Sequence, residues 1–101
     1  MTEAILSELA QAVETQLGGK AAFVQGVPVH ETHNGQTVWD GIVHVFDLTG
    51  HPRGAFRAYA WCSELEGGKR QPVVIMHTPQ IKGPREAVAV AMVREARSRG
   101  S

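Results

Sequence analysis

Several features that mark secreted or membrane proteins are missing from this chain. A single cysteine, Cys62, cannot form a disulfide within the chain, and no run of about 18 apolar residues is long enough to cross a bilayer. The N-terminus lacks a basic segment followed by an apolar one, so no signal peptide is expected. We therefore expect a cytoplasmic protein that does not associate with a membrane.

An excess of charge is missing as well. The 101 residues hold ten basic and ten acidic side chains, so the formal net charge is zero. The charges are unevenly placed, because residues 1–52 carry one base against six acids and residues 53–101 carry nine bases against four acids. This asymmetry fits a basic binding face, complementary surfaces on neighbouring subunits, or a fold that simply interleaves the two halves.

The composition is that of one globular domain. Apolar residues make up 43% of the chain and charged residues 20%, which are ordinary proportions for a folded domain. A chain of this length can bury enough surface to fold alone. The sequence has no internal repeat and no segment of low complexity. We expect a single domain that spans residues 1–101.

Two stretches, one at each end of the chain, have the pattern of helices. Between Thr2 and Leu17 the apolar residues recur at every third or fourth position, and Gly18 suits the end of such a helix. Pro84 fits the first turn of a second helix. This second helix contains seven consecutive apolar residues, 87–93, which predicts burial on more than one side.

Strands are expected between the two helices. The first runs from Lys20 to Thr32, where Pro28 indicates an edge strand or a bulge, and Asn34 with Gly35 predicts a hairpin turn after it. Its large apolar residues are expected on one face: Phe23, Val27 and Val29. A further strand over residues 71–78 has apolar side chains that point both ways, so both faces of the sheet should be covered.

The central hairpin, residues 36–62, consists of two runs rich in β-branched and aromatic residues around a turn rich in Gly, Pro and His. We expect Asp47 to pair with Ala55, although the long turn leaves other registers open. One face would then carry Ile42, His44, Phe46, Phe56, Ala58, Ala60 and Cys62. The other would carry Trp39, Gly41, Val43, Val45, Arg57, Tyr59 and Trp61, with Trp61 covering Gly41.

The order of these elements predicts an α+β fold. We expect a two-layer sandwich in which a four-stranded antiparallel meander sheet carries both helices on one face, in the order α-β-β-β-β-α. A single core is expected to contain Leu9, Val13, Phe46, Phe56, Ile75 and Val88.

Catalytic and metal-binding patterns are weak. The five histidines lack the spacing of a metal site, so no metal or cofactor is expected. Asp40 and His44 with Ser63 or Cys62 contain the groups of a nucleophilic triad, but no motif that activates a nucleophile surrounds them. No catalytic residue is therefore assigned. A small enzyme that uses His44 or His77 with Asp40 stays an alternative, decided by whether either histidine lines a pocket beside Asp40.

A nucleic-acid interface is a second alternative. Basic side chains for phosphates next to aromatic rings for stacking are how sheet surfaces bind single strands. Tyr59 and Trp61 would supply the rings, whereas the zero net charge speaks against this function. The basic residues are Arg53, Arg57, Lys69, Arg70, Lys82 and Arg85.

Self-association explains the aromatic face best. If both helices cover the opposite side, this face is a large apolar patch, and such patches seldom stay exposed on monomers. We therefore expect a non-catalytic homodimer that binds a small ligand or a protein partner. The residues expected at the interface or ligand site are Trp39, Val43, Val45, Arg57, Tyr59, Trp61 and Met76, with Val74 beside them.

The segment 38–52 reads Val-Trp-Asp-Gly-Ile-Val-His-Val-Phe-Asp-Leu-Thr-Gly-His-Pro, and residues 57–61 read Arg-Ala-Tyr-Ala-Trp. In these stretches the chain resembles small uncharacterised bacterial proteins carried on mobile elements and integron gene cassettes, over roughly residues 30–95. The resemblance implies a bacterial cytoplasmic protein encoded by an accessory gene. It implies no activity and assigns no functional residue.

Overall fold

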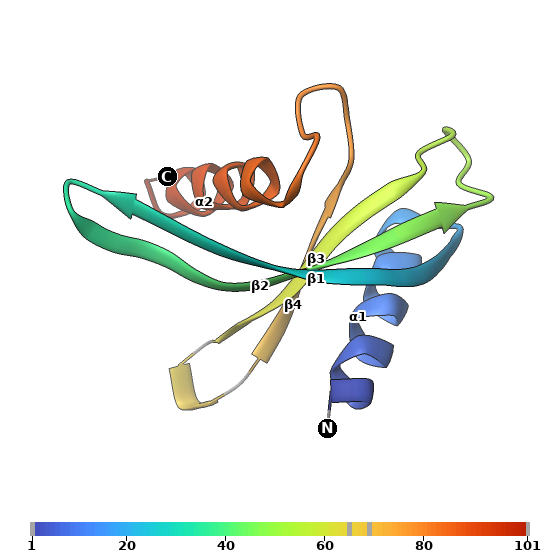
Figure 1. The fold of residues 1–101 in the computed structure, drawn as a ribbon, viewed down its shortest axis with the longest axis horizontal. Helices are drawn as coiled ribbons and strands as arrows, with labels where there is room; N and C mark the ends of the chain where they lie inside the picture. The colour runs from blue at the N-terminus through green and yellow to red at the C-terminus, as the bar shows by residue number, and fades with distance from the viewer. Residues whose placement is uncertain (1, 65, 69, 101) are drawn as a thin grey trace.

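A computed structural model describes residues 2–64, 66–68 and 70–100. Figure 1 shows the order of the elements. They are α1 (Thr2–Leu17), β1 (Lys20–His33), β2 (Gln36–Thr49), β3 (Arg57–Glu64), the short 3-10 helix η1 (Glu66–Gly68), β4 (Arg70–Met76) and α2 (Pro84–Gly100). The four strands form one sheet in the order β1-β2-β3-β4, and every neighbouring pair is antiparallel. The predicted α+β class, element order and antiparallel meander are confirmed.

The long β1–β2 hairpin follows from its turn residues. Asn34 and Gly35 both have positive φ angles, 54° and 78°, as the two-residue turn that matches strand twist requires. The turn and the edge position of β1, predicted from Pro28, are both confirmed. Pairing then moves from Phe23↔Phe46 to Gln25↔Val45, which leaves one extra residue on β1 as a bulge.

This bulge overturns the prediction that Phe23, Val27 and Val29 share a face. An extra residue inverts the alternation of side chains beyond it. Phe23 therefore packs edge-on against Phe46, with ring centroids 5.8 Å apart, whereas Val27 and Val29 join the cluster on the other side of the sheet.

The β2–β3 register differs from the predicted one by two residues. Asp47 pairs with Arg57 rather than with Ala55. Because side chains alternate with a period of two, a shift of two keeps the predicted faces. Phe56 is the exception: it precedes β3, its side chain is 55% exposed, and it does not belong to the core. Its backbone carbonyl accepts a hydrogen bond from the Leu48 N–H, which closes the loop 50–56.

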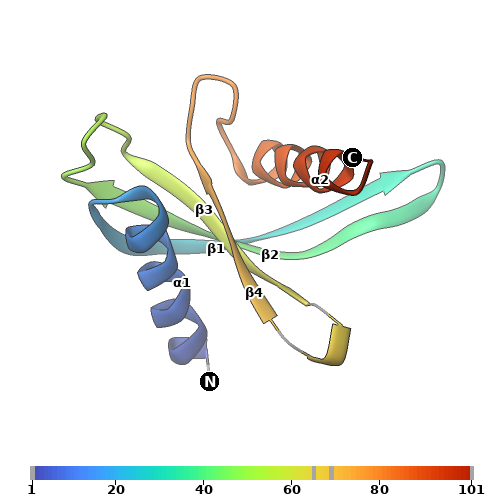
Figure 2. The ribbon, with the colours of Figure 1, turned by 180° about the vertical axis from the view of Figure 1, so that it is seen from behind.

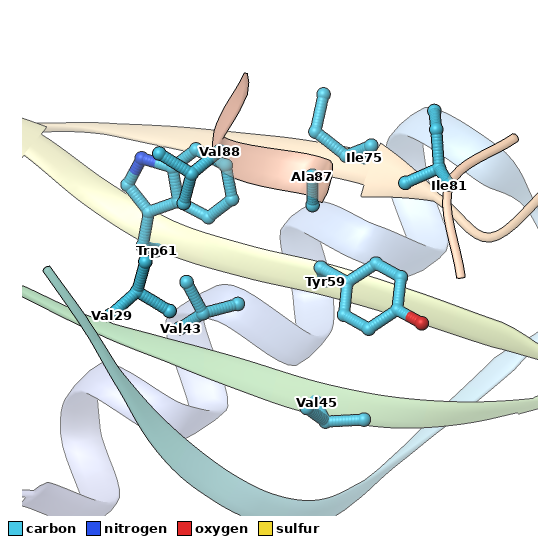
Figure 3. Close-up of a cluster of buried hydrophobic side chains, with 9 residues drawn as sticks. All are labelled: Val29, Val43, Val45, Tyr59, Trp61, Ile75, Ile81, Ala87 and Val88. Atoms are coloured by element: carbon cyan, nitrogen blue, oxygen red, sulfur yellow. The ribbon is translucent and has the colours of Figure 1, made fainter. Parts of the chain in front are cut away.

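The two helices cover opposite faces of the sheet, so the prediction that both lie on one face is wrong (Figures 1 and 2). Apolar side chains project from both sides of β2 and β3, and each side needs a cover of its own. The cluster beneath α1 contains Leu9, Val13, Phe46, Leu48, Ala58 and Ala60. The cluster beneath α2 contains Val29, Val43, Val45, Tyr59, Trp61, Ile75, Ile81, Ala87 and Val88. Figure 3 shows this second cluster on one side of the sheet, with α1 behind it.

The single core predicted from the sequence is therefore two. Ile75 and Val88 lie beneath α2, apart from the cluster of Leu9, Val13 and Phe46. β4 also faces the other way from the prediction. Met76 pairs with Ala58, and Val74 packs against the α1 cluster.

α2 is less buried than its sequence predicts. Ala87 and Val88 are fully buried, but Ala89 and Val93 are exposed, so the helix contacts the sheet along one side. Its first turn is tied to the end of β1 by Arg85, whose guanidinium donates to both carboxylate oxygens of Glu31 at 2.8 and 3.2 Å. Neither helix, over the residues that the structure describes, is long and apolar enough to span a membrane.

Candidate functional site

The sheet splits between its two middle strands. β2 and β3 pair only from Asp47↔Arg57 to His44↔Ala60. From Gln36 to Val43, β2 pairs with β1 alone among the described residues, and from Trp61 onward β3 pairs with β4 alone. β2 has 14 residues and β3 has 8, so the long hairpin follows its own twist beyond the shared segment. Figure 2 shows the two strands diverging.

Two cavities occupy this split. The first, on the α1 side, has a volume of about 560 Å³. It is lined by Ile5, Trp39, Asp40, Gly41, Ile42, His44, Trp61, Cys62 and Ser63. The second, on the α2 side, has a volume of about 230 Å³. It is lined by Trp39, Trp61, Ser63, Gln71, Val73, Ala91 and Met92. Both cavities therefore share Trp39, Trp61 and Ser63.

The tryptophan pair separates the two cavities. The rings of Trp39 and Trp61 meet edge to face, with centroids 5.6 Å apart and planes at 75°. This arrangement places the positive edge of one ring against the negative face of the other. Trp61 is 5% exposed, and it lies beside Val88 of α2 (Figure 3). Trp39 is half-buried.

Gly41 makes room for this pair. A β-carbon at this position would lie 3.1 Å from Cη2 of Trp39, closer than ordinary van der Waals contact. The sequence predicted a tryptophan over Gly41, but named Trp61. The register explains the difference, because the shift by two residues moves Trp61 away from Gly41 and the Trp39 ring takes its place.

The polar groups of the first cavity include the residues that the sequence assembled into a triad. Asp40, His44, Cys62 and Ser63 all line it. His44 therefore lines a pocket that Asp40 also lines, which was the condition for the enzyme alternative, whereas His77 lines a different cavity. The Nδ1 atom of His44 is shielded from solvent and has no hydrogen-bond partner among the described residues.

Asp40 does not complete a relay through His44, because its carboxylate has another partner. The Asp40 carboxylate pairs with His30 across the β1–β2 hairpin, at 3.4 Å between Oδ1 and Nδ1. It is 69% exposed, so water screens its charge. Over the described part of the chain, no group of three or more His, Cys, Asp or Glu side chains is placed to hold a metal ion.

The residues predicted to form an exposed aromatic face of the sheet are mostly covered by α2. Val43, Val45, Tyr59 and Trp61 are all at most 5% exposed. Arg57 is half-buried, with its Nε 3.5 Å from the Asp47 carboxylate. Met76 lies on the α1 face. The premise of the predicted dimer interface, an uncovered aromatic face, is therefore wrong. Self-association through other residues stays a prediction.

The basic residues proposed for nucleic acid do not form one described surface with the aromatic rings. Arg57 and Arg85 are engaged in ion pairs with Asp47 and Glu31. Arg53 and Lys82 are exposed on loops. Lys69 and the side chain of Arg70 lie outside what the structure describes. Because Tyr59 and Trp61 are buried, the stacking surface that this alternative needs is not available on the folded chain.

Sequence reasoning missed the split and the outer walls of its cavities. Ile5 of α1 and Met92 of α2 reach the cavities from opposite faces of the sheet. The available signal was the unequal length of the two runs of the central hairpin, since a longer strand must continue past its partner.

Comparison of the chain with known protein families, with curated proteins and with solved structures finds no match. The resemblance to cassette-encoded proteins therefore stays a prediction, and the function is argued from the geometry of the chain itself.

Proposed function

We propose that the protein binds a small, flat and largely apolar molecule with a positively charged nitrogen in the split between β2 and β3. The observation that carries this proposal is the pair of cavities that share Trp39, Trp61 and Ser63. The larger volume, about 560 Å³, lies within the usual range of about 300–1,000 Å³ for small-molecule sites.

The lining of the larger cavity favours a cation. Its described residues include one carboxylate, that of Asp40, and no lysine or arginine. Tryptophan rings attract cations through their negative faces, and Trp39 is half-exposed at the cavity. A protonated amine or a quaternary ammonium on an apolar body satisfies these groups best.

Intrinsic fluorescence tests the proposal directly, because the chain has only two tryptophans and both lie in the split. The probes are benzyltrimethylammonium, the neutral benzyl alcohol and the anionic benzoate. We expect a saturable fluorescence change with the cation, a weaker one with the alcohol and none with benzoate.

Paired variants identify the site. Asp40→Asn should weaken binding of the cation several-fold and leave the alcohol unaffected, because only the charge is removed. Asp47→Asn, on the same strand but outside the cavity, serves as the control. Equal binding of all three probes, or equal effects of the two variants, would contradict the proposal.

Hydrolysis is the second candidate, since Asp40, His44, Cys62 and Ser63 line one cavity. An enzyme of this kind would react at Ser63 or Cys62 with His44 as the base. A fluorophosphonate probe with mass spectrometry tests for labelling of Ser63, and iodoacetamide tests Cys62. Labelling that disappears in His44→Gln would favour an enzyme, and unlabelled protein would favour simple binding.

A further inference from the structure

A different cavity lies at the opposite end of β3, between the loop 50–56 and the segment that follows β4. Its volume is about 360 Å³. It is lined by Arg53, Gly54, Ala55, Phe56, Met76, His77, Thr78 and Pro79. Phe56 is 55% exposed here, which is a costly position for a large apolar ring unless something covers it. Its ring lies against the imidazole of His77, with centroids 4.8 Å apart.

Tyr59 fixes the orientation of His77. The Tyr59 hydroxyl lies 2.8 Å from Nδ1 of His77. The tyrosine ring is buried among the apolar side chains beneath α2, and its hydroxyl points out of that cluster (Figure 3). The backbone N–H of His77 donates to the Arg57 carbonyl at 3.0 Å, so its main chain is held as well.

This contact occupies Nδ1 and leaves Nε2 as the imidazole nitrogen that can meet a ligand. Burial raises the pKa of Tyr59, so its hydroxyl keeps its proton at neutral pH, although the nearby charge of Arg57 acts in the opposite direction. When the hydroxyl donates to Nδ1, a neutral His77 carries its own proton on Nε2. Nε2–H is then the hydrogen-bond donor that His77 has left.

The charge at this cavity is positive. Arg53 is exposed and lines the cavity, and the described lining contains no carboxylate. The guanidinium of Arg57 lies 6.0 Å from the centre of the Phe56 ring, although Asp47 partly neutralises it. An exposed ring, an exposed guanidinium and the imidazole of His77 therefore surround one space.

We propose that this cavity binds a small planar anion, a carboxylate attached to an aromatic or unsaturated group. Its flat part would stack on Phe56, and its oxygens would accept hydrogen bonds from Arg53 and from Nε2–H of His77. Stacking explains an exposed ring, and the two donors explain a preference for a carboxylate. This site is separate from the split and does not depend on the function proposed there.

The test is a titration of the native protein with benzoate, followed by proton–nitrogen NMR. We expect saturable shifts in the amides of the loop 50–56 and in the ring nitrogens of His77, with tryptophan fluorescence unchanged. Benzamide, which has the same shape without the charge, should bind about tenfold more weakly or worse, as expected for the loss of a charged hydrogen bond.

Variants assign the binding to this cavity. Arg53→Gln changes an exposed loop residue and should fold normally, and it should weaken benzoate about tenfold. Arg94→Gln, on the exposed side of α2, is the matched control and should bind as the native protein does. Tyr59→Phe should change the nitrogen shifts that report which imidazole atom is protonated.

Three results would overturn the proposal. They are an absence of shifts around the loop 50–56, equal affinity of Arg53→Gln and Arg94→Gln, and a spectrum of the native protein that places the neutral His77 proton on Nδ1. Benzoate shifts that appear only at the tryptophans would place the anion in the split, and would contradict this site and the cation preference of the split together.

Discussion

The two faces of the sheet are packed in opposite ways. Beneath α1 the residues that β3 presents are small, Ala58 and Ala60, and the helix supplies larger ones, Leu9 and Val13. Beneath α2 the sheet presents the rings of Tyr59 and Trp61, and the helix supplies Ala87 and Val88. Where β3 meets the two helices, large side chains from one layer therefore lie against small ones from the other, which is how close-packed layers interdigitate.

The difference determines where polar chemistry is found. Large rings that carry a hydroxyl or an N–H bring polar atoms into the α2 face, and such atoms need partners when buried. Tyr59 reaches His77 at one end of β3, and Trp61 lies beside Ser63 and the split at the other. The cluster beneath α1 contains aliphatic side chains, Phe46 and alanines, and polar groups on that side, such as His44, line the larger cavity of the split. Both proposed sites therefore lie next to one of these two rings, although the larger cavity of the split is on the α1 side.

The largest expected effect comes from truncating a ring on either face. Trp61→Ala beneath α2 and Phe46→Ala beneath α1 should each lower the free energy of unfolding by about 3–5 kcal/mol, measured by urea denaturation. Phe56→Ala is the control, and it should cost about 1 kcal/mol or less because the ring is 55% exposed. A Trp61→Ala variant of native stability that sediments differently would show that the ring lies between subunits instead.

An intermediate effect on stability is expected from enlarging a buried alanine of the sheet, compared with an exposed alanine of α2. Ala60 is fully buried beneath α1, so Ala60→Leu should cost about 1–3 kcal/mol by overpacking. Ala89 is exposed on α2, so Ala89→Leu should change stability by about 0.5 kcal/mol or less. Equal costs for the two variants, again from urea denaturation, would mean that α1 does not pack closely on this face.

Removing one hydroxyl probes the polar edge of the α2 face. Tyr59→Phe should lower the free energy of unfolding by about 1 kcal/mol, because it removes the hydrogen bond to His77. Urea denaturation of the variant and the native protein measures this loss.

Tyr59 also makes the stability of the protein depend on pH. Its pKa in the folded chain is raised above the usual 10.0, so below that value the hydroxyl is neutral in both the folded and the unfolded states. Above it the unfolded chain ionises first, and stability falls as the pH rises.

Unfolding by urea at about pH 9 and about pH 11 measures this loss. The native protein should lose more stability between the two than Tyr59→Phe does, because phenylalanine cannot ionise. Parallel losses in the two proteins would contradict the assigned burial of the hydroxyl.

The smallest effect is expected where α2 meets β1. The Arg85 guanidinium, which donates to the Glu31 carboxylate, holds the pKa of that carboxyl below its usual value of 4.5. The stabilisation by this pair is therefore present above pH 4.5 and is lost as the pH falls through the lowered pKa. Glu31→Gln should lower the melting temperature slightly at neutral pH and match the native protein in acid.

The change in melting temperature should be small, because the Arg85–Glu31 pair lies at the surface, where water and salt screen it. Glu8→Gln, an exposed acid on α1, is the control and should behave as the native protein at both pH values. A difference between Glu31→Gln and the native protein that persists in acid would mean that the side chain matters for packing rather than for charge.

The sequence by itself determined the elements and most of their ends. Asn34 and Gly35 specify a tight turn, Gly18 ends α1, and Pro84 begins α2, because each acts through backbone geometry within a few residues. Alternation within β2 and β3 also determined which of their side chains share a face, even though the register was predicted two residues away. It also named Asp40, His44, Cys62 and Ser63 as the groups of a possible triad, although it could not show that they line one cavity.

The tertiary structure alone decided which face each helix covers, where β1 bulges, how far β2 and β3 stay paired, and that Phe56 remains outside the core. None of these depends on local preference. Which face a helix covers depends on how its side chains fit those that project from the sheet. Two strands separate where their twist and unequal length outweigh further pairing. These are competitions between residues far apart in the chain, and their outcome is set by packing volumes and burial that no short stretch of sequence contains.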